Sequence, residues 1–209
     1  MRSSPYLAFV PWLLFGLISR QDSLKAATVA ALVAAIAVSL PSIARRRVKV
    51  LEIASIAAFG AFVILAFATN PGPDSVLERY ARAFASATLA LIALGSLLLI
   101  PFTEQYARES VPEQFWSSPR FKRINRVLTL TWGLIFAAIA VSHVFAGAID
   151  TRRAQTIFNW VIPIALLVLG LKYMEAYRAR ETAEEGTSEP TVRTTGSLSD
   201  TASGEKRRP

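Results

Sequence analysis

The residues that could do chemistry are few and scattered in this sequence of 209 residues. The chain has no cysteine and one histidine, His143. A thiolate nucleophile, an iron–sulfur cluster and a disulfide are therefore excluded, and one imidazole supplies neither a bis-histidine haem nor the usual zinc site. The aspartates stand far apart, at Asp22, Asp74, Asp150 and Asp200. Since no glycine-rich phosphate loop is present either, we expect no enzyme, no metal site and no cofactor.

A few polar residues inside apolar stretches are the remaining candidates for chemistry. Ser142 and His143 adjoin in one stretch, and Asn159 and Trp160 adjoin in the next. Polar groups are costly in hydrocarbon, so such residues can line the path of a substrate or an ion. The acidic residues, however, lie outside the apolar stretches or at their ends, whereas coupled transport generally needs an acid near the bilayer midplane. Two interpretations stay open: packed helix residues, or a polar path in a small transporter or channel.

The apolar stretches themselves predict the fold. Hydrophobic residues make up 53% of the chain and are clumped into runs, several of them near the roughly 20 residues that cross about 30 Å of hydrocarbon. We expect an all-α, polytopic integral membrane helix bundle over residues 1–180, with about six transmembrane helices at residues 5–19, 24–43, 50–69, 83–102, 127–149 and 156–173. The first stretch is short, so five spans is the alternative. Residues 181–209 are polar and are expected to form a disordered tail.

Local signals predict where several helices begin and what holds their ends. Ser75 with Glu78, and Ser110 with Glu113, have the spacing of a capping box, in which each side chain bonds the other residue's backbone N–H. Glu52 follows a basic turn, and we expect it to pair with the arginines at positions 45–47.

Small residues predict which helix faces pack closely. Ala26, Ala30 and Ala34 are spaced four apart, and Gly95 and Ser96 fall in the fourth apolar stretch. Small side chains let helix backbones approach where no hydrophobic force drives helices together. We expect these residues at helix–helix contacts.

The segment at about 103–126 separates the fourth and fifth apolar stretches and mixes aromatic with charged residues. Phe115 and Trp116 are followed by Arg120, Lys122 and Arg123. We expect an amphipathic segment at the membrane interface, with the aromatic rings in the headgroup layer and the charges toward water and anionic lipid. Those five residues form either a docking surface for partner proteins or lipid headgroups, or a solvated loop with membrane anchors.

The charge distribution predicts the topology. The chain carries a net charge of +8, but its basic residues lie in short loops beside apolar runs, so we expect no nucleic-acid partner. With six helices, most of the 23 lysines and arginines fall in the N-terminus, the second and fourth loops and the C-terminal tail. The positive-inside rule therefore places both termini in the cytoplasm.

The order of these features resembles the intracellular septation protein A family of inner-membrane-spanning proteins. The resemblance is carried by ARRRVKVLEIASIAAFGAFVILAF at 44–67, VPEQFW at 111–116 and LTLTWGLIFAAIA at 128–140, and it extends in layout over roughly residues 5–175. It implies a protein of the bacterial plasma membrane that supports cell-envelope integrity and septation by interacting with the bilayer and with envelope or division proteins. A homo-oligomer is a further expected assembly, and the resemblance brings no catalytic residue.

Overall fold

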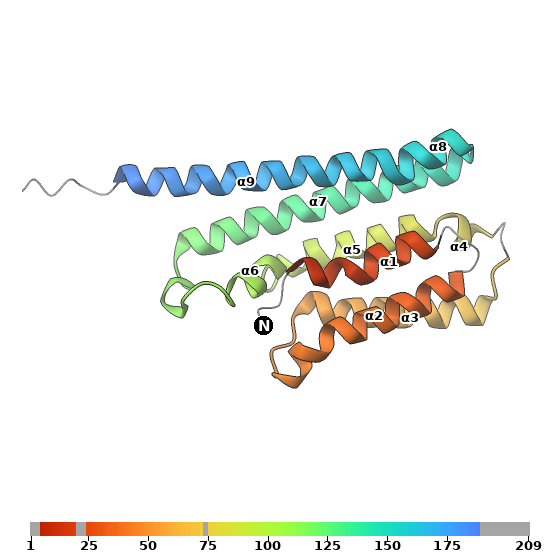
Figure 1. The fold of residues 1–209 in the computed structure, drawn as a ribbon, viewed down its shortest axis with the longest axis horizontal. Coiled ribbons are helices and arrows are strands. Elements are labelled where there is room, and N and C mark those ends of the chain that lie inside the picture. Colours follow the sequence, from red (N-terminus) through yellow and green to blue (C-terminus); the bar gives the residue numbers. More distant parts are fainter. Residues whose placement is uncertain (1–4, 20–23, 73–74, 189–209) are drawn as a thin grey trace, which may run out of the picture.

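The computed structural model describes residues 5–19, 24–72 and 75–188, which are helical with no strand among them. The order of elements is η1 (Pro5–Phe9), α1 (Val10–Ile18), α2 (Leu24–Ala44), α3 (Val50–Thr69), α4 (Val76–Arg79), α5 (Ala81–Ser96), α6 (Phe102–Ala107), η2 (Glu113–Phe115), α7 (Pro119–Ile149), α8 (Arg152–Thr156), η3 (Ile157–Val161) and α9 (Ile162–Ser188). The long helices lie side by side, with α7 and α9 along one side of the bundle and α2 and α3 along the opposite side (Figure 1). Helices α1 and α5 lie between these two pairs.

Four of these helices are long and apolar enough to cross a membrane: α2, α3, α7, and the continuous helix at 152–181 formed by α8, η3 and α9. The apolar helices at 7–18 and 81–96 are shorter. The predicted all-helical fold is therefore confirmed, with four helices that could cross a membrane, whereas the count of about six spans is not.

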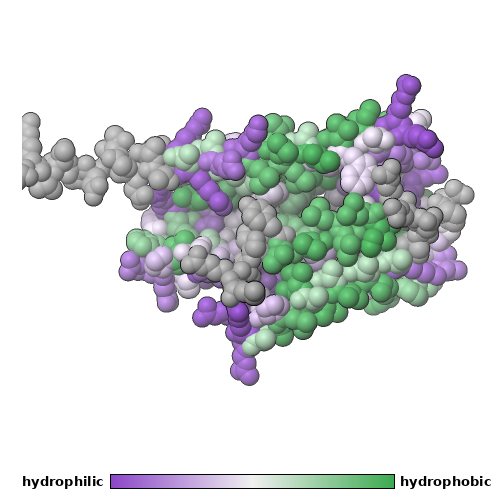
Figure 2. All heavy atoms as spheres, viewed as in Figure 1, coloured by the Kyte–Doolittle hydropathy of each residue, from purple (hydrophilic) through white to green (hydrophobic). Residues whose placement is uncertain are grey.

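The surface of the bundle is apolar where a bilayer would surround it. Large apolar side chains point outward, among them Ile64, Leu91, Leu98 and Leu99. Figure 2 shows hydrophobic residues across the middle of the molecule and hydrophilic residues gathered at its two ends. A soluble monomer rarely exposes such a continuous apolar area, so this pattern indicates a membrane protein.

The closest helix packing occurs between α5 and α7. A Cβ atom placed on Gly133 would lie 2.6 Å from Leu94 Cγ, and one placed on Gly147 would lie 2.7 Å from the Tyr80 ring. Such small residues let the two backbones approach along most of the α5 helix. Gly95, by contrast, is exposed and has open space around it, so its predicted packing role is wrong, while Ser96 is buried as expected.

The alanine-rich α2 packs through a face one residue removed from the predicted one. Ala27, Ala31 and Ala35 are fully buried, whereas Ala26 is exposed. Both sets have the same spacing, and only the position of neighbouring helices selects between them.

The fourth and fifth apolar stretches have different limits from those predicted. Helix α5 ends at Ser96 rather than at residue 102, because the Ser96 hydroxyl donates to the Ala93 carbonyl (2.7 Å) and accepts from Phe102 N–H (3.1 Å). Pro101 then precedes a new helix, α6. Residues 119–126 continue without a break into 127–149 as the single helix α7, so this part of the expected interfacial segment belongs to a spanning helix.

Only one of the two hydrogen bonds of the first predicted capping box forms. The Ser75 hydroxyl accepts from Glu78 N–H (3.2 Å) as expected, but the Glu78 carboxylate accepts from Leu24 N–H on α2 (3.3 Å). It therefore joins α4 to α2 instead of returning to its own cap.

The second predicted capping box is wrong. The Ser110 hydroxyl donates to the Ala107 carbonyl, and Glu113 begins only a single 3₁₀ turn. The N-cap used here is Ser118, whose hydroxyl accepts from Phe121 N–H (3.2 Å) just before Pro119 at the first position of α7, where proline has no N–H to lose.

The predicted tail is helical at its start. Helix α9 continues to Ser188, past residue 181 where the predicted tail begins, and residues 189–209 lie outside the described residues. Glu181 explains part of this extension because it forms an ion pair with Arg123 of α7 (2.9 Å).

We predict that Gly133→Val destabilises the bundle by roughly 1–3 kcal/mol, because the added side chain must displace Leu94 from a closely packed contact. Gly95→Val is the matched control, with the same substitution at a helical position in open space. Thermal unfolding in detergent micelles measures both variants. Equal losses of stability in the two variants would contradict the close contact between Gly133 of α7 and Leu94 of α5.

Candidate functional site

A buried charged cluster holds together the end of the bundle where the α2–α3 turn meets α6. Lys49 is 4% exposed, and its Nζ lies 2.6 Å from Glu109 Oε1 and 3.6 Å from Glu52 Oε1. The same ammonium lies 4.5 Å from the centre of the Tyr106 ring. Because a buried charge without a partner is strongly destabilising, Lys49 fixes the position of the segment after α6 relative to α3.

Glu52 has different partners from those the sequence suggested. Its carboxylate accepts hydrogen bonds from Ser42 Oγ (2.9 Å) and Lys49 N–H (3.3 Å), in addition to its contact with Lys49 Nζ. The expectation that the arginines at 45–47 hold Glu52 is therefore wrong. Those arginines point outward, as expected for strongly hydrated charges at the end of a membrane bundle.

Helix α6 is buried rather than lying flat on an interface. Phe102, Glu104 and Tyr106 are all buried, and Gln105 accepts a hydrogen bond from Val50 N–H at the start of α3 (2.8 Å). The Tyr106 hydroxyl has no hydrogen-bond partner among the described residues. Burial, reinforced by the charges of Glu52 and Glu109, raises the pKa of Tyr106, so its phenol stays protonated and able to donate.

The two predicted aromatic docking residues have different environments. The Trp116 indole N–H donates to the Val111 carbonyl (2.8 Å), and its ring lies 5.2 Å from the Arg108 guanidinium, which in turn pairs with Glu104 (2.6 Å). Phe115 is 49% exposed. Trp116 therefore fixes the η2 turn, and Phe115 is the ring that this turn presents outward.

The three predicted basic docking residues also differ from one another in their contacts. Arg120 and Arg123 form ion pairs with Glu181 of α9, at 3.7 Å and 2.9 Å, and Arg120 also donates to the Glu181 carbonyl. Lys122 points outward. Two of the three charges thus join α7 to α9, and both Lys122 and the paired Arg123 are exposed at the surface.

The residues proposed for a polar path are held by contacts with neighbouring helices or within their own helix. Ser142 Oγ donates to the Phe158 carbonyl (2.6 Å), while His143 Nδ1 lies 3.0 Å from Ser86 Oγ and 3.2 Å from the Arg82 carbonyl oxygen. The Asn159 side chain donates to Gln155 within its own helix, and Trp160 is half-buried in η3. Ser142 faces η3, and the His143 imidazole reaches both α5 and the Asn159 backbone of η3.

Pro163 explains why a hydroxyl donor is needed at the position of Ser142. Pro163 has no N–H and so cannot bond a carbonyl in the preceding turn, which forms the π-helical element η3. A carbonyl left without an N–H inside a membrane bundle must find another donor. The Ser142 hydroxyl supplies that donor to Phe158.

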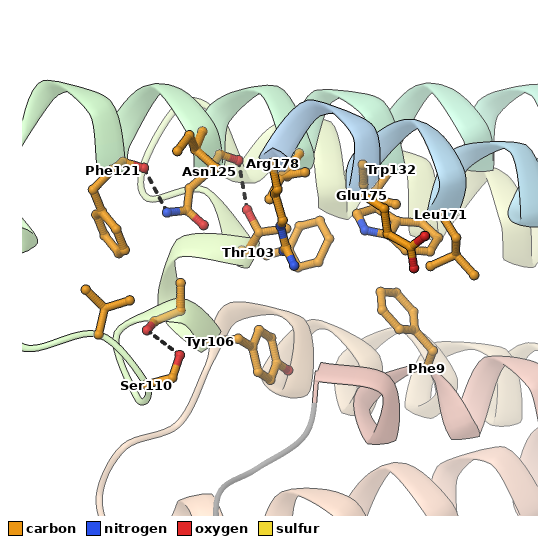
Figure 3. A pocket seen from close by; sticks show the side chains of 16 residues that line it. Phe9, Thr103, Tyr106, Ser110, Phe121, Asn125, Trp132, Leu171, Glu175 and Arg178 are labelled. Carbon is orange, nitrogen blue, oxygen red and sulfur yellow. Dashed lines mark hydrogen bonds between the residues drawn. The ribbon is translucent and has the colours of Figure 1, made fainter. Parts of the chain in front are cut away.

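A cavity of about 580 Å³ lies beside the charged cluster, between η1, α6, α7 and α9 (Figure 3). Its polar lining comes from Thr103, Tyr106, Ser110, Asn125, Glu175 and Arg178, and its remaining lining is apolar. Sequence reasoning missed this cavity, because its walls come from segments far apart in the chain. A weak signal existed in α9, where Leu171, Met174, Glu175 and Arg178 recur at helical spacing.

Comparison of the chain with protein-family models, with curated proteins and with solved structures finds no match in any of the three. The resemblance to the septation protein family therefore stays a prediction.

We predict that Lys49→Met destabilises the protein by about 3–5 kcal/mol, since it leaves Glu52 and Glu109 near each other without their cation. Arg47→Met removes one positive charge from an exposed position in the same turn and serves as the control. Denaturant unfolding in micelles measures both. Similar stability of the two variants would contradict a structural role for the buried lysine.

We also predict that the effects of Ser142→Ala and Pro163→Ala are coupled. Restoring an N–H at position 163 gives the η3 carbonyls a backbone donor, so Ser142→Ala should cost roughly 1 kcal/mol with proline present and less in the Pro163→Ala background. A double-mutant cycle on unfolding free energies gives the coupling. Strict additivity would exclude this explanation of Ser142.

Proposed function

We propose that this protein is a non-enzymatic, polytopic plasma-membrane protein that supports cell-envelope integrity or septation by binding partner proteins or lipid headgroups. The proposed docking face includes the exposed residues Phe115 and Lys122, and Trp116 follows Phe115 at the end of the η2 turn. The observation that carries the proposal is the exposure of Phe115 at 49% on a turn whose neighbouring ring is fixed. An aromatic ring presented on a fixed backbone binds with little loss of conformational entropy.

The positive charge at the α6 end of the bundle supports one orientation of the protein in the membrane. The exposed arginines at 45–47 and Lys122 belong to the same end of the bundle as α6 and η2. The positive-inside rule assigns such an end to the cytoplasm. We propose that the docking face meets cytoplasmic or inner-leaflet partners, with both termini on that side.

The alternative of a transporter receives no comparable support. Ser142 and the Asn159 side chain already bond neighbouring groups of the helices, and His143 lies against α5. These contacts account for Ser142 and His143 as links between packed helices and for the Asn159 side chain as a bond within its own helix, so we propose binding as the function.

We predict that the double variant Phe115→Ala/Lys122→Gln loses localisation while the protein remains in the membrane. Ile157→Ala/Arg153→Gln is the matched control, because it changes an exposed apolar residue and an exposed cation at the opposite end. Imaging a carboxy-terminal fluorescent fusion, shown to replace the native protein in dividing cells, measures localisation.

The wild type and the control should concentrate at the division site, and the docking-face variant should spread evenly over the membrane. A uniform wild-type signal would contradict the septation role. Equal enrichment of the variant and the control would instead contradict the docking face.

A further inference from the structure

One end of the cavity beside α6 is an aromatic wall. It is formed by Phe9 of η1, Phe102 of α6 and Trp132 of α7. The centre of the Phe9 ring lies 5.6 Å from that of Trp132 and 6.1 Å from that of Phe102. Rings at these distances pack directly against one another. They therefore form one continuous apolar wall, and a ligand rests against it instead of entering between the rings.

Most of the neutral polar groups that line the cavity already have partners within the protein. Thr103 Oγ1 donates to the Asn125 carbonyl (2.8 Å), and Asn125 Nδ2 donates to the Phe121 carbonyl (2.8 Å). The Ser110 hydroxyl donates to the Ala107 carbonyl (3.1 Å). These donors hold the walls of the cavity together, so they do not define what it binds.

The Glu175 carboxylate is the lining group whose charge is not used by the protein. The Tyr106 hydroxyl is buried and cannot be reached from the cavity. Arg178 lines the cavity but takes part in an interaction of its own. Glu175 lines the cavity and is exposed, and it has neither an ion pair nor a hydrogen bond among the described residues. A ligand can therefore reach its carboxylate.

This carboxylate lies at the aromatic end of the cavity. Figure 3 shows Glu175 extending from α9 toward Phe9 and Trp132. Water screens a charge less beside an apolar wall than in bulk solution, so the carboxylate attracts a positive charge more strongly there. A cation with an apolar body gains this attraction and also covers the rings. A small inorganic cation gains only the first, and an anion is repelled.

We propose that the cavity is a binding site for an amphiphilic organic cation, of the class of quaternary ammonium compounds with an aromatic or short alkyl body. Glu175 binds the cationic group, and the body lies against the aromatic wall. The volume of about 580 Å³ is within the range of roughly 300–1,000 Å³ that is common for ligand pockets. The inference does not depend on the docking function, because neither Phe115 nor Lys122 lines the cavity.

The test uses the full-length protein in uncharged maltoside micelles and two probes with the same benzyl body and opposite charge, benzyltrimethylammonium and phenylmethanesulfonate. Equilibrium dialysis measures the binding of each probe. The wild type should bind one cation per chain, about tenfold more tightly than the anion. Equal binding of the two probes, or no saturable binding of the cation, would overturn the proposal.

A matched pair of variants tests the role of the carboxylate. Glu175→Gln should lower the affinity for the cation about tenfold and remove the preference between the probes. Glu113→Gln removes an exposed acid of η2 that does not line the cavity, and it should leave both affinities unchanged. An equal effect of the two substitutions would show that net charge attracts the cation, and this result would also overturn the proposal.

A second pair of variants tests the cavity without changing charge. Leu171 lines the cavity, whereas Leu169 of the same helix does not, and both are exposed. Leu171→Trp should fill the cavity and abolish binding of the cation, while Leu169→Trp should not, and thermal unfolding confirms that both variants are folded. Equal binding by the two variants would contradict the proposal. So would a co-purifying phospholipid that Leu171→Trp removes while the wild type binds neither probe, since a lipid would then be the occupant.

Discussion

The buried ammonium of Lys49 is the interaction on which one end of this protein depends. It lies between two carboxylates, Glu52 at the start of α3 and Glu109 after α6, and a charge in that position is tolerated only with such partners. The lysine therefore joins two parts of the chain that are separated by helices α3, α4, α5 and α6. Without the lysine, the buried Glu52 of α3 and the half-buried Glu109 would repel each other, and the segment after α6 would lose its attachment to α3.

Everything proposed for function lies next to this contact. Tyr106 borders both the Lys49 cluster and the cavity, so the cluster supports one wall of the cavity. Arg108, one residue before Glu109, fixes Trp116 and through it the turn that presents Phe115. The α7–α9 pair closes the other side of the cavity, and Glu181 ties it to Arg120 and Arg123. The cavity and the docking face thus share one structural support while using different residues.

The sequence predicts the features that depend on local composition. Long apolar runs identify the membrane-type helices, and the limits of α2 and α3 follow from turn residues and charges beside them. Features that depend on distant partners were not predictable in this way. The Lys49–Glu109 contact joins residues 60 positions apart, and Gly133 rather than Gly95 became the close-packing glycine because of which face α5 turns to α7. The shorter helices α1 and α5 likewise depend on their packing within the bundle, which leaves the number of spans open to sequence reasoning.

A distance measurement tests most directly whether Lys49 fixes the α6 end of the bundle. The chain has no cysteine, so Arg47→Cys and Gln114→Cys, both at exposed positions, allow a pair of spin labels without other changes. Pulsed electron paramagnetic resonance in lipid nanodiscs should give one narrow distance distribution, and adding Lys49→Met should broaden it markedly. A narrow distribution that is unchanged by Lys49→Met would contradict the central role of this buried lysine.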